Sequence, residues 1–188
     1  MAEPLRDLLH AWLAEQLEED PVLATSLGAE GHDDRLPDLS ADDIRRRERN
    51  DRAWLERLAG VDAEGLTDDD LIDRDLAVSA LRGREALRGW EVWRRDPATY
   101  VEPCLEGVFT LFLHRLHPAP ELARLAATRL REVPRVLAEA RDNLEPSLVP
   151  RVFLDRARGQ VSAGIHYARE LVPTEVGDAG ARQAVAEA

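Results

Sequence analysis

The stretch TDDDLIDRDLAVSALRGREALRGWEVWRRD, residues 67–96, decides the fold of this chain. It begins with Thr67, a good helix-capping residue, and three aspartates follow in the first turn, where carboxylates meet the positive end of the helix dipole. Arg94 and Arg95 lie at the far end, where cations are favoured, and Pro97 prevents continuation. We therefore expect one helix over residues 67–96, the longest of the chain.

One face of this helix is predicted to be buried, because apolar and small residues recur on it at the helical period. These residues are Ile72, Leu76, Ser79, Ala80, Gly83, Leu87 and Trp90. Further helical patterns cover residues 3–19, 40–60, 121–143 and 151–171, an apolar segment fills 96–118, and residues 22–40 look like a turn-rich loop. The sequence thus predicts an all-α fold, an irregular antiparallel array of about six helices organised around the 67–96 helix. We expect a single domain over residues 1–172, with a frayed or truncated tail at 173–188.

Charge and composition exclude several classes of protein. The chain has 37 acidic and 25 basic residues, a net charge of -12, which repels nucleic-acid phosphates and anionic membranes. No apolar run is long enough to span a bilayer. All the cations are arginine, as in GC-rich, actinobacterial-type genomes. Cys104 is the single cysteine, so an internal disulfide is impossible, and we expect a cytoplasmic protein in which this thiol is buried.

Two polar clusters are the candidate site residues, and we expect both to face a cleft. His32, Asp33, Asp34 and Arg35 follow one another in the glycine-containing loop, which either binds a ligand or is an ordinary connection tied down by side-chain hydrogen bonds. The second cluster, Asp73, Arg74 and Asp75, either contributes oxygen ligands for a cation or is solvated and ion-paired on the helix surface. We assign no catalytic residue and no metal ligand in this chain.

The least polar segment, Val108 to Leu113, is expected to be buried on several sides or to form a patch that awaits a partner. His114 and His117 follow it, three apart on one predicted helical face that ends before Pro118. That spacing permits a shared metal, and an independent metal enzyme using these histidines and nearby acids is one hypothesis.

The order of short motifs along the chain resembles the N-terminal part of the bacterial domain-of-unknown-function 885 family, whose members look like helical zinc metallopeptidases. Each motif alone is short, whereas their order and spacing cover most of the chain. The matching pieces are DP (20–21), ATSLG (24–28), HDDRLPDLS (32–40), DRDL (73–76), ALR (80–82), WE (90–91), RDP (95–97), Tyr100, RL (129–130), VP (133–134), Leu137 and ARDNL (140–144).

Members of that family are several-fold longer, and their zinc-binding helix, resembling HExxPGHH, lies downstream of the part that matches here. The resemblance therefore implies an all-α N-terminal segment that walls the cleft of a metal-dependent hydrolase and is inactive alone. It implies zinc for the full-length family and no cofactor in this chain. The expected partner is the remainder of the same polypeptide, or a second copy, bound through the Val108–Leu113 patch. The alternative is a stand-alone helical module for protein interaction or self-association.

Overall fold

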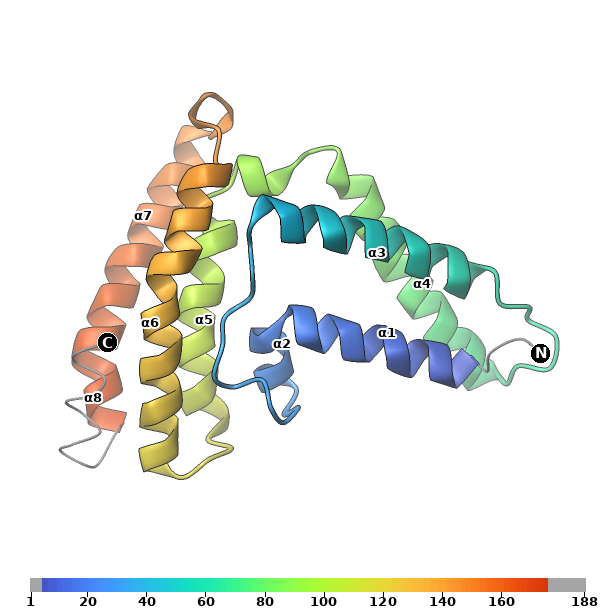
Figure 1. Cartoon of the computed structure of the whole chain (residues 1–188), viewed down its shortest axis with the longest axis horizontal. Helices are drawn as coiled ribbons and strands as arrows, with labels where there is room; N and C mark the ends of the chain where they lie inside the picture. Colours follow the sequence, from blue (N-terminus) through green and yellow to red (C-terminus); the bar gives the residue numbers. More distant parts are fainter. Residues whose placement is uncertain (1–4, 176–188) are drawn as a thin grey trace. The chain divides into compact units, whose positions relative to one another are not determined.

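The computed structural model describes residues 5–175, and every regular element in that range is helical (Figure 1). The α-helices are α1 (Leu5–Glu19), α2 (Pro21–Ser26), α3 (Ala41–Ala59), α4 (Asp68–Arg88), α5 (Ala98–His114), α6 (Ala119–Asn143), α7 (Arg151–His166) and α8 (Val172–Glu175). Short 3-10 turns occupy Val92–Arg94 and Pro146–Leu148, and a π-helical turn, Tyr167–Leu171, joins α7 to α8. The predicted all-α class is confirmed, and no helix among the described residues is long and apolar enough to cross a membrane.

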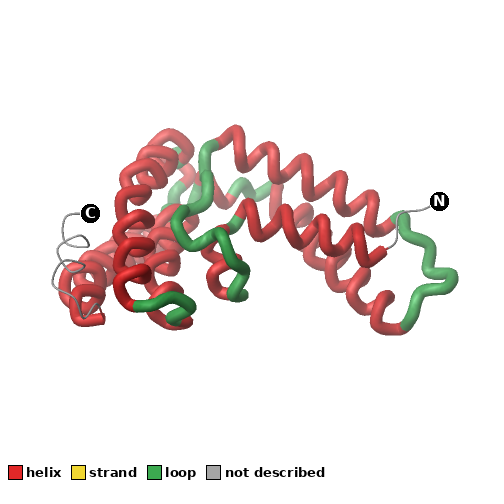
Figure 2. The backbone as a smooth tube through the Cα atoms, turned by 60° about the horizontal axis from the view of Figure 1, so that its bottom comes forward, coloured by secondary structure: helices red, strands yellow, loops and turns green. Residues whose placement is uncertain are grey.

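The helices group into two compact units, which the loops connect (Figure 2). Within the described residues, unit 1 comprises 5–19 and 41–91, and unit 2 comprises 20–40 and 92–175. Packing into two units does not decide whether each folds independently, so the single domain over residues 1–172 stays a prediction. Of the expected tail, residues 173–175 belong to α8, and the rest lies outside the described residues.

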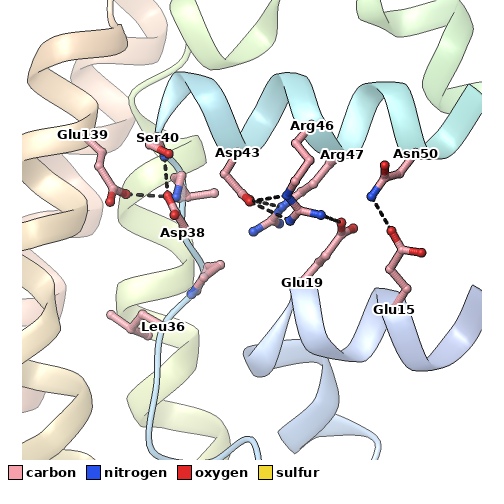
Figure 3. Close-up of polar contacts among 12 residues, drawn as sticks. Glu15, Glu19, Leu36, Asp38, Ser40, Asp43, Arg46, Arg47, Asn50 and Glu139 are labelled. Carbon is pink, nitrogen blue, oxygen red and sulfur yellow. Dashed lines mark hydrogen bonds and ion pairs between the residues drawn. The ribbon is translucent and has the colours of Figure 1, made fainter.

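Unit 1 is formed by α1, α3 and α4, which pack against one another. Its core consists of Leu5, Leu8, Trp54, Leu58, Ala77, Val78 and Leu81. Polar bonds join α1 to α3 along the edge of this core: Arg46 contacts Glu19 at 2.9 Å, and the Trp54 indole donates to Glu15 at 2.7 Å. Figure 3 shows the Arg46–Glu19 contact beside the bonds of Asp43 to Arg46. Arg45, Arg46, Arg47 and Arg52 of α3 are thus ion-paired on the helix surface.

The prediction of which face of α4 is buried is wrong, because the opposite face of the helix packs into the core. Ile72, Leu76 and Leu87 are all more than half exposed, whereas Leu81 is 1% exposed and lies between α1 and α3. Both faces carry apolar residues at helical spacing, so periodicity alone could not choose between them. Burial against α1 and α3 decided the rotation.

Helix α4 is also shorter than predicted. It begins as expected, since Thr67 and Asp70 form a capping box in which each side chain bonds the other residue's backbone N–H. It ends at Arg88, and Glu91 then adopts a left-handed backbone conformation (φ 47°) that stops the helix well before Asp96. Among the described residues the longest helix is therefore α6, with 25 residues.

Unit 2 is built on α5 and α6, whose facing sides are almost wholly apolar. Val108, Leu111 and Phe112 are buried there with residues of α6, as expected for a segment buried on several sides, while Phe109 and Leu113 remain exposed. Cys104 is buried as predicted, and burial raises the pKa of its thiol to about 11. The apolar segment of the sequence is thus the central helix of this unit.

Part of the predicted 22–40 loop is helical instead. Pro21 occupies the first turn of α2, and the Asp20 carboxylate accepts a hydrogen bond from the Leu23 amide at 2.9 Å. An aspartate cap followed by proline is a signal for the start of a helix. The apolar run that follows is too short to show the helical period. The loop proper runs from residue 27 to 40 and turns at Gly28 and Gly31, both with positive φ.

Candidate functional site

Arg129 of α6 is fully buried in unit 2, and its guanidinium is the centre of the most extensive polar cluster there. It donates to the main-chain oxygens of Arg35 (3.1 Å), His32 (3.2 Å) and Pro21 (3.2 Å), and also to that of Gly107. These acceptors belong to α2, α5 and the 27–40 loop. One side chain therefore fastens three separate segments to α6.

A chain of hydrogen bonds continues from Arg129 to the protein surface. Arg129 donates to the Thr25 hydroxyl (2.6 Å), and this hydroxyl lies 2.6 Å from one oxygen of the Asp33 carboxylate. The other oxygen of Asp33 lies 2.7 Å from Nε2 of His117. We name Thr25, Asp33, His117 and Arg129 the arginine cluster. It connects the loop to the segment between α5 and α6.

The charges in the arginine cluster compensate one another. Burial lowers the pKa of Arg129 to about 10, opposed by the nearby Asp33, so the guanidinium stays charged at neutral pH. Burial by itself raises the pKa of Asp33, but hydrogen bonds from Thr25 and His117 and the charge of Arg129 outweigh it and hold that pKa below its usual range. A buried charge needs such partners, because removing one leaves the other uncompensated.

A second set of α6 side chains fastens the end of the same loop. The Glu139 carboxylate accepts a hydrogen bond from the amide of Leu39 at 3.0 Å, and the Asn143 amide donates to the Leu39 carbonyl at 2.7 Å. Figure 3 shows Glu139 beside the loop residues Leu36, Asp38 and Ser40. Arg135 also donates to the Leu36 and Pro37 carbonyls. The loop is thus bonded to α6 along most of its length.

The structure separates the roles of the four predicted loop residues. Asp33 is buried in the arginine cluster, and Asp34 is exposed. The His32 ring lies 2.9 Å from the Arg35 guanidinium, and both residues offer their main-chain oxygens to Arg129. This is the geometry of a connection tied down by hydrogen bonds, one of the two alternatives for this loop. Whether these residues also face a cleft stays a prediction.

Asp73, Arg74 and Asp75 lie in unit 1, and their side chains do not converge. Arg74 binds Asp75 at 2.9 Å and donates to the Val61 carbonyl at 3.3 Å. Asp73 instead lines a groove between α1 and α4. Within the described residues, Arg74 and Asp75 therefore form an ion pair, and the Asp73 carboxylate is exposed. The role of the segment at a cleft stays a prediction.

The prediction that His114 and His117 share one face of a helix is wrong. Helix α5 ends at His114, Arg115 adopts a left-handed conformation (φ 50°), and His117 lies beyond the helix. Both histidines line a small hollow with Asp33, but the Asp33 carboxylate is already bound by Thr25 and His117. The described residues contain no group of three or more metal-ligand side chains, so their donor set does not fit zinc.

Unit 2 also contains an apolar groove. It has a volume of about 230 Å³, lies between α5, α6 and α7, and is lined almost entirely by apolar atoms. Helix α7 packs closely on α5 at Gly164, where an added Cβ would lie 2.1 Å from a methyl group of Leu105. Helix α7 also leaves apolar side chains exposed at Val152, Leu154, Val161 and Ile165.

This is an all-α protein whose 27–40 loop is fastened by a buried arginine. The chain belongs to the family described as "bacterial protein of unknown function (DUF885)", whose model matches residues 21–188. No curated protein and no solved structure matches the chain. The match includes the whole arginine cluster.

Sequence reasoning missed Arg129 and His117 as partners of Asp33. The available signal was the position of Arg129, which continues the apolar face of α6 formed by Leu122, Leu125 and Ala126. An arginine on the buried face of an amphipathic helix indicates a paired charge, since arginine is rarely buried without partners. The sequence offers no comparable signal for His117, because its partner lies 84 residues away.

Proposed function

We propose that this chain is the N-terminal helical segment of a metal-dependent, peptidase-like hydrolase and is inactive alone. In the full-length protein its helices would wall the substrate cleft. Two findings support this proposal: the family membership and the ordered motifs through which the sequence resembles helical metallopeptidases. The description of the family assigns no activity, so hydrolysis is part of the proposal.

The observation that carries the proposal is the open apolar groove of unit 2. Val161 and Ile165 line it and remain substantially exposed, as does Leu137 on the opposite wall. Covering apolar surface stabilises a protein by about 25 cal/mol per Å² removed from water. Further helices of the same polypeptide would gain this free energy by packing into the groove.

Zinc would be held by residues outside the described part of this chain. Asp33 and His117 form a carboxylate–histidine pair, but the second oxygen of Asp33 is bound by Thr25. In the proposed arrangement the loop and α6 would supply a rigid wall of the cleft, and a metal held elsewhere in the polypeptide would supply Lewis-acid chemistry.

The first test is the intact mass of the native polypeptide in its source cell, followed by zinc analysis and peptide hydrolysis. We expect a mass several-fold above 21.0 kDa, zinc and hydrolysis in the whole polypeptide, and neither zinc nor hydrolysis in the 188-residue chain. A native mass of 21.0 kDa, or stoichiometric zinc and hydrolysis in the short chain, would overturn the proposal.

A second test places a charge in the groove of the full-length protein. Val161→Asp should lower the thermal stability and activity of the whole polypeptide, because the new carboxylate would be buried without a partner. Val152→Asp is the matched control, since Val152 is exposed on the same helix and does not line the groove. Equal effects of the two substitutions would show that nothing packs into the groove.

Self-association is the second candidate function. The Val108–Leu113 patch is limited to Phe109 and Leu113, and Phe109 packs edge-on against Tyr167 with ring centroids 6.0 Å apart. These residues would form the contact between two copies of a stand-alone module. Sedimentation of the chain as a dimer that Leu113→Ser dissociates would support this function, and a monomer at high concentration would contradict it.

A further inference from the structure

We propose that a groove on unit 1, between α1 and the first turns of α4, binds a basic, amphipathic peptide segment of a partner protein. We name it the acidic groove. This interaction surface is separate from the proposed hydrolase role, because it lies in the other unit and does not depend on a metal. Its failure would leave that proposal untouched.

The acidic groove combines an apolar floor with a charged rim. It has a volume of about 470 Å³. Its lining residues are Leu9, Trp12 and Leu13 from the apolar side of α1, Arg6 and His10 from the same helix, and Asp69, Asp70 and Asp73 from α4. Apolar side chains thus form part of its lining, and its charge is mainly negative.

The three carboxylates of the rim differ in their surroundings. Asp70 is already engaged, because it bonds Thr67 in the capping box and pairs with Arg6 at 3.3 Å. Asp69 and Asp73 are exposed one helical turn apart and have no ion-pair partner among the described residues. Two adjacent carboxylates repel each other and attract a cation.

The apolar side chains beside this rim also lack cover. Leu13 is exposed on α1, and Ile72 and Leu76 are exposed on α4 close to Asp73 in sequence. Leu9 and Trp12 line the groove and are only partly buried against the core of unit 1, so apolar atoms of both remain available to a ligand.

A basic peptide segment satisfies both features. An arginine or lysine would pair with Asp69 and Asp73, and a leucine or isoleucine would cover the apolar floor. A second copy of this chain fits less well, because its net charge of -12 would bring like charges together. A bare metal ion would leave the apolar floor uncovered. The negative charge of the acidic groove therefore favours a basic partner segment.

The test uses a labelled, alanine-based helical peptide with leucines on one face and arginines flanking them, titrated with the 188-residue chain. We expect saturable binding, measured by fluorescence anisotropy, that weakens as salt rises. Asp73→Asn should weaken binding about threefold, the range for an exposed ion pair. Asp68→Asn is the matched control, since Asp68 is an exposed carboxylate at the start of the same helix that does not line the groove.

The apolar contribution is tested with the same peptide. Leu13→Ser should weaken binding several-fold, while Leu23→Ser, a similarly exposed leucine in unit 2, should not. Equal binding of a peptide with glutamate in place of arginine would overturn the proposal. Equal losses from Asp68→Asn and Asp73→Asn would also overturn it, because the attraction would then be general charge. A dimer that Asp73→Asn dissociates would assign the groove to a second copy instead.

Discussion

Nε2 of His117 lies 2.7 Å from Oδ2 of Asp33, which joins the 27–40 loop to the segment that follows α5. The other oxygen of Asp33 is bound by Thr25, and Thr25 in turn accepts from Arg129. The stability of unit 2 should therefore depend on the charge of one buried carboxylate.

Asp33 should contribute to the acid sensitivity of folding. Its pKa is lowered on folding, so its contribution is fully present above the unfolded pKa near 3.8 and is lost as pH falls through the folded value. Asp33→Asn should cost about 3 kcal/mol at pH 7, because Arg129 loses the carboxylate charge that most favours its own charged form. Urea denaturation between pH 3 and 7 should show that this difference shrinks at the acid end. Asp34 is an exposed neighbour, so Asp34→Asn should change the free energy of unfolding little. Equal losses of stability from Asp33→Asn and Asp34→Asn would contradict the role of Asp33.

Arg129 should not be replaceable by lysine. Lysine keeps the charge, but its three donors on one nitrogen cannot reach acceptors in α2, α5 and the loop together. We expect Arg129→Lys to lower the free energy of unfolding by about 2–3 kcal/mol. Faster amide exchange in residues 27–40 would show that the loop is released. Arg131→Lys, at an exposed position of the same helix, is the control and should change neither the free energy of unfolding nor the amide exchange of the loop.

Two glycines of α7 should respond oppositely to alanine. Gly159 has open space around it, so Gly159→Ala should stabilise the helix by about 0.5–1 kcal/mol. At Gly164 a Cβ would meet Leu105 at 2.1 Å, and Leu105 would have to move into the apolar groove of unit 2. Gly164→Ala should therefore be at least about 1 kcal/mol less stable than Gly159→Ala. Thermal melts that rank the two variants equally would contradict the close packing of α7 on α5.

The orientation of α4 can be tested with two leucines of the same helix. Leu81→Ala should cost about 2–4 kcal/mol because it leaves a cavity among α1, α3 and α4. Leu87 is 70% exposed, so Leu87→Ala should change stability by less than about 0.5 kcal/mol. If chemical denaturation showed a larger loss of stability for Leu87→Ala than for Leu81→Ala, the buried face of α4 would be the one that periodicity predicted.

The sequence by itself determined the class of fold and the position of most helices. Capping residues, prolines and helical periodicity are local signals, and Thr67 with Asp70 forms the predicted helix start. The same local signals indicated Cys104 as a core residue, and they left the 108–113 segment either buried on several sides or a patch that awaits a partner. They also singled out Asp33, although without its partners.

Tertiary structure decided what the local signals left open. Helix α4 has apolar residues on two faces, and packing against α1 and α3 selected the one that contains Leu81. The arginine cluster joins residues as far as 104 positions apart, since Thr25 meets Arg129 only when α2 and α6 pack in the same unit. Periodicity reports which residues share a helix face; only the packed chain decides which face is buried and which distant charges meet.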